Sequence, residues 1–145
     1  MAERIRPKAV CVCRRGESIL VGAGYDAAKG ETFFSPPGGG VEFGERAVDA
    51  VRRELREELA VEVCDLTLLG VLENIFTFEG QPGHEIVFVF EARFTDAALY
   101  EREEFVGVEA GQPLVARWMP LAQFGPGDPP LYPAGLLALL RAPAG

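Results

Sequence analysis

The sequence predicts an α/β fold in which a mixed β-sheet lies between helices. The chain has 145 residues and 48% hydrophobic content, which is enough for one core. Strand-like segments stand on both sides of one amphipathic helical segment, and a second apolar helix closes the chain. Because no repeat or low-complexity segment divides the chain, we expect residues 1–145 to form a single domain.

The N-terminal part predicts short strands separated by turns. The expected strands are residues 8–14, 18–25 and 33–35, and Arg15-Gly16-Glu17 joins the first two as a hairpin. Residues 26–31 are polar and predict a loop. The segment Pro36-Pro37-Gly38-Gly39-Gly40 predicts a shaped loop, since two prolines and three glycines oppose regular structure.

Residues 45–59 predict an amphipathic helix. Gly44 is the expected N-cap, and Glu45 lies at the positive end of the helix dipole. One stripe of the helix is apolar and is made of Ala47, Val48, Val51, Leu55 and Leu59. We expect this stripe to pack on the sheet.

The C-terminal part predicts more strands and a closing helix. The expected strands are residues 63–78, 85–94 and 114–119, with a loop over 79–84, and the expected helix is 132–141. The run Ile86–Phe90 is apolar on both faces, which predicts a central strand covered from both sides.

Charge and composition exclude several classes of protein. The formal net charge is −8, so we expect the protein to bind neither nucleic acid nor an anionic membrane surface. No apolar run reaches the roughly 18–20 residues that span a bilayer, and the N-terminus opens on charged residues. We therefore expect a cytoplasmic protein. The three cysteines are too few for a disulfide framework, and Cys11 and Cys13 are interpreted as buried hydrophobic residues.

Three carboxylates share one small patch of the predicted helix. Glu54, Glu57 and Glu58 are spaced i, i+3 and i+4, and Glu58 projects partly into the apolar stripe. One explanation is a solvated acidic face paired with Arg52, Arg53 and Arg56. The other is a divalent cation, because Mg²⁺ is held by a few carboxylates together with substrate phosphates and water.

The residues around this patch resemble the Nudix box, G-x5-E-x7-R-E-U-x-E-E-x-G-U, where U is a bulky aliphatic residue. The matching positions are Gly39, Glu45, Arg53, Glu54, Leu55, Glu57, Glu58 and Val61. Ala60 stands where the family has glycine, which affects the helix C-cap and removes no carboxylate.

The resemblance implies a Nudix fold and a hydrolase of a nucleoside diphosphate linked to another moiety. It implies Mg²⁺ or Mn²⁺ as cofactor, and metal-activated water as the nucleophile. The implied metal ligands are Glu54, Glu57, Glu58 and the carbonyl oxygen of Gly38, and Glu54 or Glu57 would be the general base. Arg53 would pair with Glu45 and orient the acidic residues as part of the catalytic set, and Gly39 and Glu45 would be the scaffold of the box.

Relatives often add an acidic ligand from a later loop. Glu103, Glu104 and Glu109 are the candidates, of which we expect Glu109. Arg14 and Arg15 are candidates for contacting substrate phosphates, although surface arginine is the default interpretation.

Two short signatures mark the later strands. Glu73-Asn74-Ile75-Phe76 and His84-Glu85-Ile86 are similar to E-N-x-F and H-E-I in a subset of Nudix proteins. Phe76 and His84 are therefore candidate substrate-binding residues, and the alternative for His84 is a hairpin cap. The stretch after the box carries neither marker of ADP-ribose or dinucleoside polyphosphate preference.

Two other functions compete with hydrolysis. A nucleotide-sensing module on the same fold would not need the three helix carboxylates, and an isoprenoid diphosphate isomerase usually has a degraded box. We also expect a small-molecule nucleotide as the partner. The apolar closing helix allows a homodimer.

Overall fold

The computed structural model describes residues 3–142. The strands are β1 (Arg6–Arg15), β2 (Ser18–Asp26), β3 (Glu31–Ser35), β4 (Gly38–Gly40), β5 (Val63–Phe78), β6 (Gln81–Phe94), β7 (Glu104–Glu109) and β8 (Gln112–Pro120). The helices are α1 (Ala47–Leu59) and α2 (Leu136–Arg141), and short 3₁₀ turns are η1 (Ala97–Glu101) and η2 (Leu121–Gln123).

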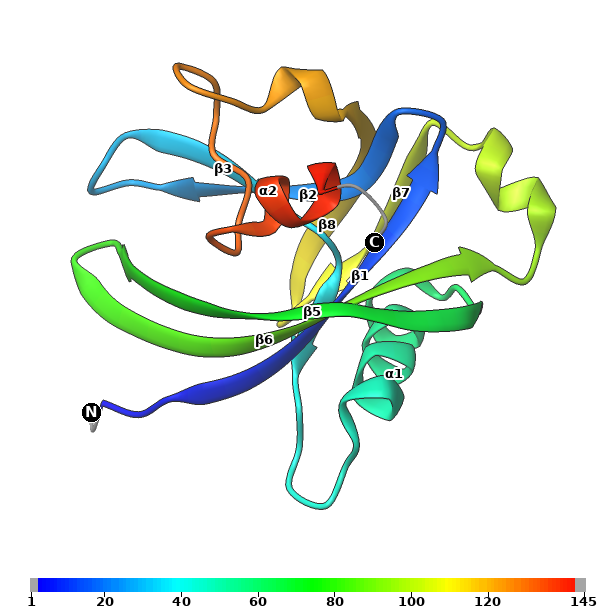
Figure 1. Cartoon of the computed structure of the whole chain (residues 1–145), viewed down its shortest axis with the longest axis horizontal. Coiled ribbons are helices and arrows are strands. Elements are labelled where there is room, and N and C mark those ends of the chain that lie inside the picture. Colours follow the sequence, from blue (N-terminus) through cyan, green and yellow to red (C-terminus); the bar gives the residue numbers. More distant parts are fainter. Residues whose placement is uncertain (1–2, 143–145) are drawn as a thin grey trace.

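The strands form a mixed sheet with the order β5-β6-β1-β2-β8-β7. In addition, β3 pairs with β2 and β4 pairs with β1. β1 and β6 run parallel, whereas the other pairs among the described strands are antiparallel. Figure 1 shows α1 and α2 on opposite sides of this sheet. The predicted α/β class and sheet-between-helices architecture are confirmed.

Alternation along the central strands divides the interior into two cores. In β1, Ala9, Cys11 and Cys13 join the core under α1, while Val10 and Val12 join the core under α2. The neighbouring β6 is also covered on both faces, as its continuous apolar run predicts. Both cysteines are completely buried, in agreement with their interpretation as core residues.

The segment around the glycine run differs from the prediction in two ways. Gly38–Gly40 is a short strand antiparallel to Lys8–Val10, because glycines allow two backbones to approach closely. The helix begins at Ala47 with Arg46 as N-cap, so the expected start at Glu45 with a Gly44 cap is wrong. Gly44 has φ of +84°, and the chain turns there before the helix can begin.

Three further boundaries differ from the prediction. A two-residue turn, Glu79-Gly80, joins β5 to β6, so residues 81–84 lie in the strand rather than in a loop. α2 starts at Leu136, four residues later than predicted, since Gly135 is left-handed with φ of +90°. β7 was not predicted: it is an edge strand whose Phe105 is buried while Val106 and Val108 are exposed.

No helix among residues 3–142 is long and apolar enough to cross a membrane.

Candidate active site

Two glycines bring the backbone of β4 against its neighbours. A Cβ on Gly38 would lie 2.2 Å from the carbonyl oxygen of Ala9, and Gly38 has φ of +156°. A Cβ on Gly39 would lie 2.4 Å from the carboxyl carbon of Glu54. At Gly38 the near atoms belong to the backbone of β1, so glycine is needed there, whereas a side chain at Gly39 would displace the Glu54 carboxylate.

Arg53 connects the loop to the acidic edge of α1. Its guanidinium group donates to both carboxylate oxygens of Glu45, at 2.8 and 3.0 Å, and to the carbonyl oxygen of Gly40 at 3.0 Å. It also donates to Glu54 at 3.0 Å and to Glu57 at 3.2 Å. The pKa of the Glu45 carboxyl group is lowered, and the hydrogen bond from Arg53 is the largest cause. The predicted pairing of Glu45 with Arg53 is therefore present.

Glu58 is a buried carboxyl group that receives no hydrogen bond from any residue within 3–142. Glu58 is only 5% exposed, and neither of its carboxylate oxygens, Oε1 and Oε2, has a hydrogen-bond donor among the described residues. Burial first, and then the neighbouring Glu54 and Glu109, raise the pKa of Glu58 to about 9. A buried carboxylate without a partner destabilises the fold unless a positive charge lies beside it.

The strand β7 explains why Glu109 is close to Glu58. A Cβ on Gly107 would lie 1.7 Å from the backbone oxygen of Glu58, so β7 passes directly over the end of α1. Glu109 follows two residues later and points from the same face of the strand. By contrast, Glu104 pairs with Arg117 and Glu103 pairs with Arg15.

These residues fit a divalent cation. Glu54, Glu58 and Glu109 supply oxygen ligands, the type that Mg²⁺ and Mn²⁺ prefer, and Glu58 has unsatisfied acceptors. Within residues 3–142, no three carboxylate, His or Cys side chains converge on one point. Glu54 and Glu57 are instead drawn to Arg53.

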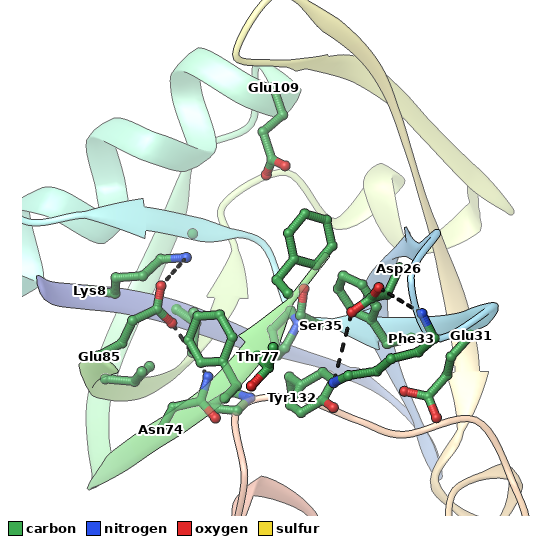
Figure 2. A pocket seen from close by; sticks show the side chains of 18 residues that line it. Lys8, Asp26, Glu31, Phe33, Ser35, Asn74, Thr77, Glu85, Glu109 and Tyr132 are labelled. Carbon is green, nitrogen blue, oxygen red and sulfur yellow. Dashed lines mark hydrogen bonds and ion pairs between the residues drawn. The ribbon is translucent and has the colours of Figure 1, made fainter. Parts of the chain in front are cut away.

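A cavity of about 290 Å³ opens beside this acidic group. Glu109 and Gly38 stand at one end of it, and Glu109 also lines an adjoining groove that reaches Glu58. Its aromatic lining consists of Phe33, Phe76, Phe78 and Tyr132. Its charged and amide lining consists of Lys8, Asp26, Lys29, Glu31, Asn74, Glu85 and Glu109. Figure 2 shows Glu109 pointing towards the cavity from one side, with Lys8 and Asp26 on opposite flanks.

Asp26 joins two hairpins across the cavity. Its buried carboxylate accepts from the backbone N–H groups of Ala28, Lys29 and Glu79, at 3.0–3.1 Å. Burial alone would raise the pKa of Asp26, but the three N–H donors and the Lys29 ammonium outweigh burial and lower it. The ionised group therefore connects the β2–β3 turn to the tip of the β5–β6 hairpin.

Comparison with known proteins identifies the family. A family model of the NUDIX domain matches residues 4–137. The chain belongs to the Nudix family. It is a hydrolase that acts on phosphorus-containing anhydrides, and the predicted family is confirmed.

Three solved structures are similar to this Nudix hydrolase. The MutT NUDIX hydrolase of Burkholderia pseudomallei is 27% identical, with 97% of this chain and 99% of that chain covered and a TM-score of 0.70. A MutT protein of Bacillus halodurans is 18% identical, with 94% and 80% covered and a TM-score of 0.58. A NUDIX hydrolase of Nitrosomonas europaea is 17% identical, with 82% and 74% covered and a TM-score of 0.58. The last two show a shared fold.

The structure brings only some of the predicted substrate-binding residues of this Nudix chain to the cavity. Phe76 lines it, with its ring lying across Gly83 of the neighbouring strand. His84 does not line it and faces a separate groove with Arg4 and Ile75, because successive strand residues point to opposite faces.

The two arginines expected to contact phosphate are also outside the cavity. Arg14 donates to Glu91 at 2.6 Å, and Arg15 stacks over Trp118 and pairs with Glu103. They are the last two residues of β1, where Glu91, Trp118 and Glu103 are their partners, so their predicted contact with phosphate stays a prediction.

Most cavity residues were not among the predicted site residues, and Asn74, Glu85, Lys8 and Asp26 are examples. Asn74 and Glu85 sit inside the quoted signatures, next to the residues that were chosen. Lys8 and Asp26 carry no local signal: Lys8 is the third residue of β1 and Asp26 is the last residue of β2. Strand alternation would have found Glu85: it points to the face opposite His84.

Proposed function

We propose that this Nudix hydrolase cleaves the diphosphate bond of a nucleoside diphosphate linked to another moiety, with Mg²⁺ or Mn²⁺ as cofactor. The observation that carries the proposal is the unsatisfied Glu58 carboxyl beside Glu54 and Glu109. This acidic group opens, through Glu109, onto an aromatic cavity. In such a substrate, the diphosphate would match the acidic group with its cation, and the base would match the aromatic cavity.

Five residues would hold the metal. They are Glu54, Glu57, Glu58, Glu109 and Gly38, the last through its backbone carbonyl oxygen. When bound, a divalent ion neutralises phosphate charge, polarises the phosphorus and lowers the pKa of a coordinated water. Glu57, at 59%, is more exposed than Glu54 and Glu58, and it would lie on the outer side of the group.

The chain's own side chains have three tasks. Arg53 holds the acidic edge of α1 and the Gly40 backbone in one arrangement, so the phosphate meets a fixed surface. Glu54 or Glu57 would accept the proton of the attacking water. Phe33, Phe76 and Phe78 would hold the base by stacking.

No covalent nucleophile is required for this reaction, because phosphoryl chemistry depends mainly on positioning and charge stabilisation. The cavity volume is at the lower end of the roughly 300–1,000 Å³ typical of ligand pockets, so a small molecule fits better than a nucleic acid. A cytoplasmic location and a homodimer stay predictions from the sequence.

A product-resolved assay tests the proposal. Nucleoside triphosphates, sugar nucleotides and dinucleotides would be incubated with Mg²⁺, with Mn²⁺ and with EDTA, and the products separated. We expect cleavage inside a diphosphate of at least one class, and none with EDTA. Cleavage that is unaffected by EDTA, or no cleavage of any substrate, would contradict the proposal.

Glu57→Gln gives the matched variant for this assay. We expect turnover to fall by at least about 100-fold at saturating Mg²⁺, with folding nearly intact. Glu62→Gln is the control, because Glu62 is also an exposed glutamate bonded to an arginine, Arg56, but lies outside the acidic group. Wild-type turnover in Glu57→Gln would show that Glu57 is not part of the site.

A further inference from the structure

Three side chains form a connected network in the cavity wall. The backbone N–H of Ala134 donates to Asn74 Oδ1 at 3.1 Å, which turns the amide nitrogen of Asn74 towards Glu85. Asn74 Nδ2 then donates to Glu85 Oε1 at 3.4 Å, and Lys8 Nζ lies 3.5 Å from Glu85 Oε2. Figure 2 shows Lys8, Glu85 and Asn74 together on one flank of the cavity.

The Glu85 carboxylate has spare acceptor capacity. An ionised carboxylate accepts about four hydrogen bonds, two at each oxygen, and here each oxygen has one partner. Both contacts are longer than the usual range of about 2.7–3.2 Å. The side chain is only 13% exposed and lines the cavity, so a ligand in the cavity can reach the two acceptor positions that residues 3–142 leave free. Two adjacent N–H donors would satisfy one position on each oxygen.

The charges of Lys8 and Glu85 favour a base over a phosphate as the group bound beside them. Glu85 already neutralises Lys8, and a phosphate placed at Lys8 would also face the Glu85 carboxylate. A neutral ligand edge avoids this repulsion. Lys8 has three N–H donors, of which Glu85 takes one, so it can also donate to an acceptor atom beside the two donors. The aromatic rings of Phe33 and Phe76 line the same cavity and suit a flat ring.

We infer that Lys8, Glu85 and Asn74 select a guanine base, with Glu85 accepting from N1–H and the 2-amino group while Lys8 donates to O6. Adenine and cytosine would each turn a ring-nitrogen acceptor towards the carboxylate, and uracil offers one N–H between two carbonyl groups. The inference rests on the proposed function for the nucleotide class, and it names the base that the same site prefers. Asn74 is a positioning residue, since it acts by orienting Glu85.

Equilibrium binding tests the base preference without turnover. GMP, AMP, CMP and UMP would be titrated into the full-length protein in Mg²⁺ buffer by calorimetry. We expect GMP to bind at least about tenfold more tightly than the other three, because the wrong base leaves buried polar groups unpaired. Equal affinities, or tighter binding of another base, would overturn the inference.

Glu85→Gln tests the residue that reads the base. Glutamine offers one acceptor and one donor, so the ratio of AMP to GMP dissociation constants should fall by at least about tenfold. Glu73→Gln is the matched control: Glu73 is an exposed glutamate on the adjacent strand and does not line the cavity. A merely structural role for Glu85 would weaken all four nucleotides equally, leave the ratio unchanged and overturn the inference.

Lys8→Met keeps the inference testable if Glu85→Gln does not fold. We expect a selective loss of GMP affinity, whereas an equal loss for all four nucleotides would show a phosphate contact and contradict the inference. A hydrolysis assay distinguishes failure of this inference from failure of the proposed function. Equal cleavage of diphosphates with every base would overturn the inference alone, while selective GMP binding without cleavage of any diphosphate would overturn only the proposed function.

Discussion

The acidic box and the cavity wall are assembled in opposite ways. Apart from Glu109, the proposed metal ligands lie between Gly38 and Glu58, on strand β4 and helix α1. The cavity wall takes residues from β1, β2, β3, β5, β6 and the segment before α2. In the proposed function, chemistry at the phosphate would therefore depend on a short stretch of sequence. Recognition of the rest of the substrate would depend on the topology of the whole sheet.

The two regions also treat charge differently. In the box, Arg53 bonds to three carboxylates while Glu58 is left unsatisfied. In the cavity wall, Lys29 pairs with Asp26 and Lys8 with Glu85. The box therefore holds more carboxylates than Arg53 alone can balance, whereas both lysines of the cavity wall already have a carboxylate partner. The predictions below test whether these roles are separable.

Leu55→Ala should give the largest change in stability. Leu55 is fully buried in the core under α1, although its neighbour Glu54 belongs to the acidic edge. We expect the free energy of unfolding to fall by about 2–5 kcal/mol, as in other core truncations, with kcat per folded molecule retained. Chemical denaturation and active-site titration measure the two quantities. Leu68→Ala, at a half-exposed position of β5, should cost far less.

If Leu55→Ala left the denaturation midpoint unchanged, the packing of the box helix would not hold the acidic edge in place. If stability and kcat fell together at low temperature, where the variant is folded, the two faces of α1 would be coupled. Either result would break the separation between scaffold and chemistry.

Phe76→Ala should affect binding rather than turnover. The Phe76 ring lines the cavity and lies over Gly83, so its removal takes away a stacking surface worth roughly 1–3 kcal/mol per base. We expect KM to rise about tenfold or more with little change in kcat. Ile75→Ala is the control, because Ile75 is the next residue and points to the opposite, exposed face. A fall in kcat with unchanged KM would move Phe76 into the phosphate chemistry.

The sequence predicted the two regions unequally for a physical reason. The helix shows a strong 3.6-residue period, and its motif has fixed spacing, so Glu54, Glu57 and Glu58 could be placed on one edge from local sequence alone. The position of Glu109 depends on β7 crossing α1 at Gly107, which no local pattern reveals. Choosing His84 over Glu85 missed the cavity by one residue, because a strand alternates its faces.

Arg14 and Arg15 show the other limit of sequence reasoning. A positive charge is a reasonable phosphate ligand, but its partners are set by distant strands: Glu91 for Arg14, and Trp118 with Glu103 for Arg15. The half-buried lysine–glutamate pair in the cavity wall joins β1 to β6, which are far apart in the chain. Such pairs follow from the parallel register of these strands.

Ala60→Gly should give the smallest effect, with the opposite sign to Leu55→Ala. Ala60 ends α1 with φ of 56° and ψ of 39°, and its N–H donates to Arg56 O at 3.0 Å. A left-handed conformation costs a non-glycine residue about 1–2 kcal/mol, and glycine adds about 0.4–1 kcal/mol of unfolded-state entropy. The strain term is larger, so we expect a net stabilisation of about 0.5–1 kcal/mol and unchanged kcat.

Ala47→Gly is the matched control for this change, because Ala47 is the first residue of the right-handed helix. There glycine relieves no strain and should only destabilise, by up to about 1 kcal/mol. Thermal unfolding of the two variants therefore separates strain relief from chain entropy. Destabilisation by Ala60→Gly would mean that the left-handed cap carries no strain. Loss of kcat would mean that the departure from the motif at Ala60 reaches the acidic edge, which would join scaffold and chemistry in the box.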